Sequence, residues 1–295
     1  MRKFLRTLWR ILTFPFWLVW SILRLIGRFF AQTTGEIRSL LTEEPEDEPI
    51  AETIQKTVEN PGGLLEHVDA LRRNIFRALA GLGLMTVVSF LYTRQLIDLL
   101  AKPVGGLEKL VAIDPTEPVG VYMRVALLCG FTLALPYIAF ELWLFIAPGI
   151  SRDSRMFSLA AIPIATLFFL AGMAFSYFVM LPAAIPFLVN FIFGMTVELR
   201  PASYIRFVTG IMFWIGISFE FPLIIYVLAR IGLVRARVLA QQWRLAVVII
   251  AVVAAMITPT IDPVNMALVM GPLIVLYVLS IGLAHIARRE KPEPA

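Results

Sequence analysis

The chain has 295 residues, of which 59% are hydrophobic and 16% are charged, and its formal net charge is +5. A soluble domain would carry about 25% charged residues, so the composition excludes an ordinary soluble protein and indicates a polytopic membrane protein. The basic residues flank apolar segments, where they set topology, and no nucleic-acid partner is expected. The single cysteine, Cys129, excludes a disulfide within the chain. No zinc-ligand spacing, P-loop or GxSxG motif occurs, so the sequence predicts no metal and no other cofactor.

Residues 1–41 are predicted to form a basic, aromatic helix that lies in the membrane interface. Four arginines punctuate residues 4–30, and the uncharged stretch between them, residues 11–23, also contains Pro15. That stretch is short beside the roughly 20 residues of a membrane span, so an interfacial helix is favoured and an additional span is the alternative. Residues 42–62 follow as an acidic linker, because the run TEEPEDEPIAE at residues 42–52 is typical of disorder.

Six apolar segments predict an all-α membrane domain over residues 63–286, followed by a cytoplasmic tail over 287–295. Barrel strands would instead alternate apolar and polar residues over about ten positions. The segments cover residues 75–92, 119–140, 157–180, 207–229, 245–258 and 264–284.

The basic residues near the ends of these segments predict the orientation of the domain. Lys and Arg are more numerous at the ends that include Arg72, Arg152, Arg235 and Arg288 than at the opposite ends. The richer side is cytoplasmic by the positive-inside rule. We therefore expect a multi-pass protein of the inner (plasma) membrane with both termini in the cytoplasm.

Two of the predicted spans have a short regular apolar reach. The apolar core of the fifth, residues 245–257, would be about 20 Å long at 1.5 Å per residue, against a hydrocarbon core of about 30 Å. Gly271 and Pro272 are predicted to interrupt the sixth. Local thinning of the bilayer, or shielding by neighbouring helices, would accommodate both.

A single carboxylate, Glu220, lies near the middle of the apolar run at residues 207–229. Charged residues at a helix centre cost about 2.5–3.5 kcal/mol on insertion scales. Pro222 follows closely and removes a backbone donor. An acid beside a helix irregularity predicts a polar concavity within the membrane, at which Glu220 contacts a partner's helix or water.

Several blocks, in this order along the chain, together resemble the TatC family of twin-arginine protein translocase subunits. GLLEHVDALRR at residues 63–73 resembles the signature H-L-x-E-L-R-x-R, and DPTEP at 114–118 is similar to an SPTEP-type loop end. LPYIAFELWLFIAPG at 135–149 resembles LPxxxxQxWxFxxPGL, and TPTIDP at 258–263 resembles a TPPD turn. Further matching blocks are FSYFVMLP at 175–182, SYIRFV at 203–208 and SFEFP at 218–222.

The resemblance implies six helices in a concave arrangement and a role in protein transport. Members of the family recognise twin-arginine signal peptides and assemble with single-spanning TatA/TatB-type subunits. The complex, within which this chain would be a homo-oligomer, moves folded proteins across the membrane using the proton-motive force. No enzymatic chemistry is implied for this subunit.

The chain departs from the family pattern at positions that concern signal binding. The signature glutamate is replaced by Ala70, with Asp69 one residue earlier, and Asn74 replaces the second arginine of the signature. Ser154 stands at a usual glutamate position beside Asp153, and a usual Tyr-Glu pair is Tyr277-Val278.

The family uses cytoplasmic carboxylates to bind the guanidiniums of the signal, because carboxylates accept bidentate, charge-assisted hydrogen bonds. The resemblance, adjusted for the departures, therefore implies a binding site built from Glu66, His67, Asp69, Arg72, Asp153 and Ser154.

Three functional hypotheses remain open at this point. In the first, Asp69 and Asp153, with Glu66, bind the signal after a small local shift. In the second, the chain is a divergent TatC-like assembly scaffold without signal recognition. The third is a small-solute secondary transporter, which would be expected to show internal repeats and paired broken helices. No convincing repeat occurs.

Overall fold

The computed structural model describes residues 61–147, 152–190, 198–230, 232–258 and 263–289, and within these ranges the chain is almost entirely helical. The predicted interfacial helix and acidic linker over residues 1–60 lie outside the described residues. The long helices are α3 (Pro61–Ser89), α5 (Glu117–Ile146), α6 (Arg152–Phe175), α8 (Pro201–Arg230) and α11 (Pro263–Arg289). The shorter ones are α4 (Thr93–Ala101), α7 (Leu181–Asn190), α9 (Ala236–Gln241) and α10 (Trp243–Ile257). A π-helical segment, Ser176–Met180, joins α6 to α7.

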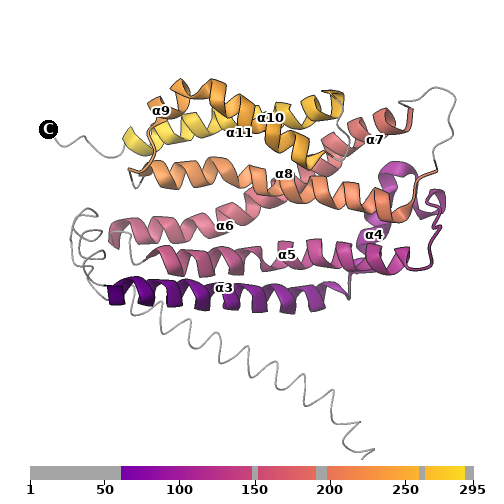
Figure 1. Cartoon of the computed structure of the whole chain (residues 1–295), viewed down its shortest axis with the longest axis horizontal. Helices are drawn as coiled ribbons and strands as arrows, with labels where there is room; N and C mark the ends of the chain where they lie inside the picture. Colours follow the sequence, from indigo (N-terminus) through magenta and orange to yellow (C-terminus); the bar gives the residue numbers. More distant parts are fainter. Residues whose placement is uncertain (1–60, 148–151, 191–197, 231, 259–262, 290–295) are drawn as a thin grey trace, which may run out of the picture.

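The long helices lie side by side along one common direction (Figure 1). Helix α3 packs on α5, α5 packs on α6 and α8, and α8 in turn packs on α11, which also contacts α10. The first residue of α3 and the last of α11 lie at the same end of this bundle, which we call the terminal end (Figure 1). The first residues of α5 and α8, together with α4 and α7, lie at the opposite end, which we call the loop end.

The helix lengths confirm a membrane bundle, with fewer full-length spans than the six predicted. In the described part of the chain four stretches are long and apolar enough to cross a bilayer, and the bent pair α3–α4 makes a fifth. Helix α10 has 15 residues and is therefore about 22 Å long, which confirms that the fifth apolar segment is short.

The predicted interruption of the last span is wrong, because α11 continues through Pro272. Helices α5, α6 and α8 likewise continue through Pro136, Pro163 and Pro222. A proline removes one backbone hydrogen bond, but neighbouring helices and local adjustments compensate for that loss inside a membrane bundle. Pro222, for example, is buried within the bundle. Among the described helices, a departure from α-helical hydrogen bonding occurs instead between α6 and α7, in the π-helical segment before Pro182.

Two glycine contacts bring pairs of helices close together. A Cβ atom placed on Gly130 of α5 would lie 2.5 Å from the Cα of Thr86 on α3. One placed on Gly172 of α6 would lie 2.9 Å from the Cα of Gly216 on α8. Small residues at such crossings allow the backbones to approach closely, which is the usual basis of helix packing in membranes. The first crossing also carries a hydrogen bond, since Ser89 donates to the carbonyl of Ala126 at 2.6 Å.

Candidate functional site

The residues predicted to bind a signal lie on two helices that begin at the terminal end. Glu66 and His67 lie in the first turns of α3, and Asp153 and Ser154 lie in the first turn of α6, though the side chains of these four are outside the described set. Asp69 and Arg72 are described and exposed. Helices α3 and α6 therefore present the candidate residues at one end of the bundle (Figure 1).

The second turn of α6 is tied to α5 near this end. The indole nitrogen of Trp143, which is buried, donates a hydrogen bond to the hydroxyl of Ser158 at 2.8 Å. Trp143 also stacks on Phe140 with ring centroids 5.9 Å apart. These contacts fix where α6 begins relative to the rest of the bundle.

The two departures from the family pattern on α3, Ala70 and Asn74, lie on the side of α3 that packs on α5. Ala70, Asn74 and Gly81 share one face of α3 by helical spacing. A Cβ atom on Gly81 would lie 2.6 Å from a ring carbon of Tyr137 on α5, and Asn74 is buried. This face is therefore turned toward α5. Asp69 precedes Ala70 by one residue and so points about 100° away, where it is exposed.

Glu220 lies where α8 meets α6. It follows Gly216 by one helical turn, and a Cβ on Gly216 would lie 2.7 Å from the ring of Phe169 on α6. The residue is half-buried, and its Oε1 is enclosed without a hydrogen-bond partner among the described residues. A buried polar atom left without a partner costs about 1–3 kcal/mol. This oxygen is therefore a place where water or a polar group from another chain would stabilise the protein.

A buried acid, Glu141 of α5, was not among the predicted site residues. It is 1% exposed, and its Oε1 accepts a hydrogen bond from the hydroxyl of Tyr137 one turn earlier. Glu141 stands at the glutamine position of the LPxxxxQxWxF pattern. The sequence indicated Glu141 only as a carboxylate just beyond residue 140, where the second span was predicted to end. Because α5 extends to Ile146, Glu141 lies within the helix instead.

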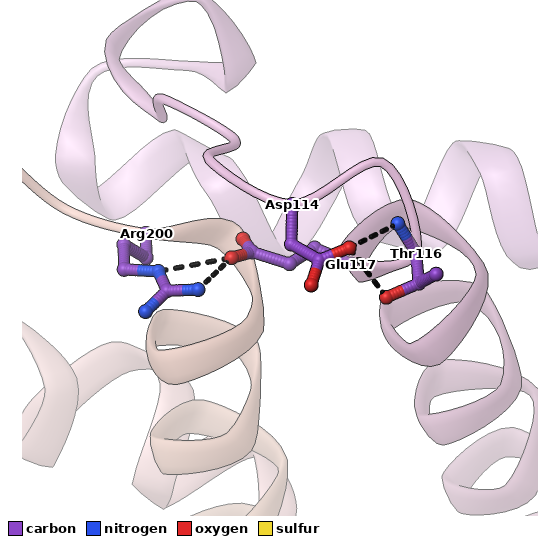
Figure 2. A network of polar contacts seen from close by, with 4 residues as sticks. All are labelled: Asp114, Thr116, Glu117 and Arg200. Carbon is purple, nitrogen blue, oxygen red and sulfur yellow. Dashed lines mark hydrogen bonds and ion pairs between the residues drawn. The ribbon is translucent and has the colours of Figure 1, made fainter.

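An ion pair at the loop end between a buried carboxylate and a half-exposed arginine was also missed. Figure 2 shows the guanidinium of Arg200, before α8, directed at Glu117, the first residue of α5. Nε of Arg200 lies 2.9 Å from Oε1 of Glu117, and Nη2 contacts the same oxygen. The Glu117 side chain is 5% exposed and that of Arg200 is 46% exposed. A backbone bond of 3.1 Å from Val111 to Leu199 joins the same two loops.

Asp114 organises the turn that leads into α5. Its Oδ1 accepts hydrogen bonds from the backbone amide of Thr116 at 2.8 Å and from the Thr116 hydroxyl at 2.7 Å (Figure 2). These bonds, the amide first, hold the pKa of Asp114 below its ordinary value. The turn places Glu117 opposite Arg200.

We expect Arg200→Gln to lower the free energy of unfolding by about 2 kcal/mol, because it leaves the enclosed carboxylate of Glu117 without a charged partner. Glu117→Gln should cost less, since the exposed part of Arg200 is solvated by water. A double-mutant cycle measured by denaturant titration in micelles should show that the two effects are not additive. Lys109 is exposed and lies in the loop between α4 and α5. Lys109→Gln is therefore the control and should change stability by less than about 0.5 kcal/mol. Additive effects would show that the pair contributes no coupling energy.

Comparisons with known proteins agree with the blocks found in the sequence. The model of the family described as Sec-independent protein translocase protein (TatC) matches residues 66–272. A protein of that name from Deinococcus radiodurans is 36% identical over 238 residues, which cover 78% of this chain and 88% of that protein. TatCd of Bacillus subtilis is 33% identical, with 77% of this chain and 93% of that protein covered.

A crystal structure of the twin arginine translocase receptor TatC superposes with a TM-score of 0.67 at 30% sequence identity. The match covers 75% of this chain and 99% of that one. The match thus includes nearly the whole of the solved chain, and the remaining quarter of this chain has no counterpart in it.

Proposed function

The chain belongs to the TatC family of Sec-independent protein translocase proteins, and from this premise we propose that it is the core membrane subunit of a twin-arginine translocation system. It is a multi-pass membrane protein. It receives folded cargo that carries a twin-arginine signal peptide, and it assembles with TatA/TatB-type single-spanning subunits. Its own role is binding and assembly, and the proton-motive force drives transport.

We place signal recognition at the terminal end, on the first turns of α3 and α6. The observation that carries this assignment is that these two helices, with the acidic residues Glu66, Asp69 and Asp153, begin at the same end of the bundle. The two arginines of a signal would donate charge-assisted, bidentate hydrogen bonds to two of these carboxylates. The terminal end then faces the cytoplasm of the cell, and both termini lie on that side of the inner membrane.

Asp69 would not act by restoring the usual geometry of the family. The position of the signature glutamate, Ala70, lies on the α5-facing side of α3, and Asp69 is exposed about 100° away from it. A signal held by Asp69 would therefore lie on the outer side of α3.

Glu220 would contact a polar group of a partner's helix at the junction of α6 and α8.

A purified twin-arginine peptide with a photo-crosslinker beside its arginine pair tests this proposal. We expect crosslinks to α3 and α6 near residues 69 and 153, and a loss of at least tenfold in peptide affinity for Asp69→Asn combined with Asp153→Asn. Asp98→Asn, an exposed acid of α4 at the loop end, is the control and should leave binding unchanged. A twin-lysine peptide should bind more weakly, because a lysine cannot form the bidentate pair.

The second candidate function, a TatC-like scaffold without signal recognition, is favoured by Ala70 and Ser154 at usual glutamate positions. It predicts that partner subunits copurify with the chain while arginine-dependent crosslinks do not form. That combination of results would replace the receptor role with the scaffold role.

A further inference from the structure

An apolar groove lies over α5 toward the loop end. Helix α5 supplies Leu127, Leu128 and Phe131, α3 contributes Leu82, and α8 contributes Gly210 and Phe213, with Arg124 and Thr209 completing the wall. The volume of this open groove is about 300 Å³, which falls at the lower end of the range of ligand sites. Phe131 and Phe213 meet edge to face, with centroids 5.0 Å apart, at one end of the groove.

The rim of the groove toward the loop end is cationic. Among the lining residues of α5, Arg124 lies nearest to that end, and Arg206 precedes Thr209 and Gly210 by about one turn on the same face of α8. Helices α5 and α8 run in the same direction, because Glu117 meets Arg200 near their first residues and Phe131 meets Phe213 farther along. This register brings Arg124 level with Arg206.

The charge of these two arginines is not neutralised within the described part of the chain. Both side chains are exposed, and neither has an ion-pair or hydrogen-bond partner among the described residues. The nearest buried acid, Glu117, is already bound by Arg200. Thr209 offers no free donor at this place, since its hydroxyl bonds to the carbonyl of Ile205 at 2.6 Å.

We propose that this groove is a binding site for an anionic phospholipid, with the phosphate held by Arg124 and Arg206 and part of an acyl chain lying against Leu127, Leu128 and Phe131. Guanidiniums bind phosphate through paired, charge-assisted hydrogen bonds. From Arg124 to Phe131 the groove extends about 10 Å along α5, which suits a segment of a hydrocarbon chain.

The shape and charge favour a lipid over a helix of a partner subunit. An α-helix with its side chains is about 10–12 Å wide and would contact a broad face. This groove instead has two aromatic rings at one end and two cations near the other. The occupant that matches both features is an acyl chain that bears an anionic headgroup.

Native mass spectrometry of the full-length protein, with phosphatidylglycerol or phosphatidylcholine of the same chain lengths added, tests the proposal. We expect the wild type to bind phosphatidylglycerol at least tenfold more tightly than phosphatidylcholine. Arg124→Gln with Arg206→Gln should remove this preference, whereas Arg94→Gln, an exposed arginine of α4, should keep it. Gly210→Leu should weaken both lipids, because a side chain there enters open space in the groove. Gly83→Leu, also in open space but outside the lining, is its control.

Four results would overturn the proposal. Equal affinity of the wild type for the two lipids would remove the headgroup site, as would an unchanged preference in the double glutamine variant. Competition by glycerophosphate as strong as that of the lipid itself would show an anion site without an acyl chain. Reduced copurification of a partner subunit with Gly210→Leu, while lipid binding stays intact, would assign the groove to a partner's helix.

Discussion

Replacing Glu220 with alanine is expected to reduce export of a twin-arginine cargo at least tenfold while the protein still inserts into the membrane. The reason is the enclosed Oε1 at the junction of α6 and α8, which has no partner among the described residues. Such an atom attracts water or a polar group of an assembling helix. Alanine leaves an apolar wall there and removes that attraction. The measurement is the fraction of cargo exported per cell, normalised to the amount of membrane-inserted protein.

Two further variants separate a polar role of Glu220 from a purely structural one. Glu220→Gln keeps both polar atoms and should retain more export than the alanine variant. Ser218→Ala removes a hydroxyl that only bonds its own helix, at the carbonyl of Trp214 2.7 Å away, and should export normally. Full export by Glu220→Ala, with partner association intact, would show that the acid has no role in transport.

Replacing Gly130 with alanine is expected to lower stability far more than the same replacement at Gly120, the other glycine of α5. The new Cβ would lie 2.5 Å from the Cα of Thr86, and a backbone atom cannot move aside as a side-chain end can. Overpacking costs about 1–3 kcal/mol, occasionally more, and the gain from replacing glycine in a helix is at most about 1 kcal/mol. We therefore expect a net loss on the order of 2 kcal/mol in the free energy of unfolding.

A matched control for this prediction lies in the same helix. Gly120 of α5 has no atom within 4 Å of a Cβ placed on it. Gly120→Ala should leave stability unchanged or raise it slightly, because alanine favours the helix. Unfolding of both variants in mixed micelles, followed by circular dichroism, measures the difference. Equal stability of the two variants would mean that α3 and α5 are not held as closely as the structure shows.

The all-helical type of the fold and the places of its long apolar helices could be predicted because membrane insertion imposes simple rules on composition, although four or five full-length spans stand in the described residues where six were expected. The short α10 followed from an apolar run bounded by Arg244 and the Thr258-Pro259 pair, and its 15 residues confirm it. The break expected at Pro272 was wrong, since a proline in a packed membrane helix has neighbours that offset its lost hydrogen bond. Helix ends were also underestimated: the second segment was expected to end at residue 140, just before Glu141, whereas α5 runs to Ile146.

Contacts between distant residues were the part that sequence could not supply. Glu117 and Arg200 are 83 positions apart, and each alone is typical of a charged residue at a helix start. Only the parallel packing of α5 and α8 pairs them. Glu141 was visible as an acid within a family block, but its burial depends on where α5 ends. Asp69 was also visible in the sequence, but the direction of its side chain was not. A shift of one position along α3 decides whether a carboxylate faces α5 or the exposed side of the helix.

We propose that this chain receives twin-arginine cargo through acids at the terminal end of a TatC bundle. The most direct test of this role is export in cells that lack their own TatC and are supplied with this chain and the TatA/TatB-type subunits from the same source. We predict that a folded reporter crosses the membrane, and that export falls at least tenfold when the arginine pair of the signal is changed to lysines or when Asp69 and Asp153 are both changed to asparagine. Export that ignores the arginine pair, or no export although the chain assembles with its partners in the membrane, would contradict the account.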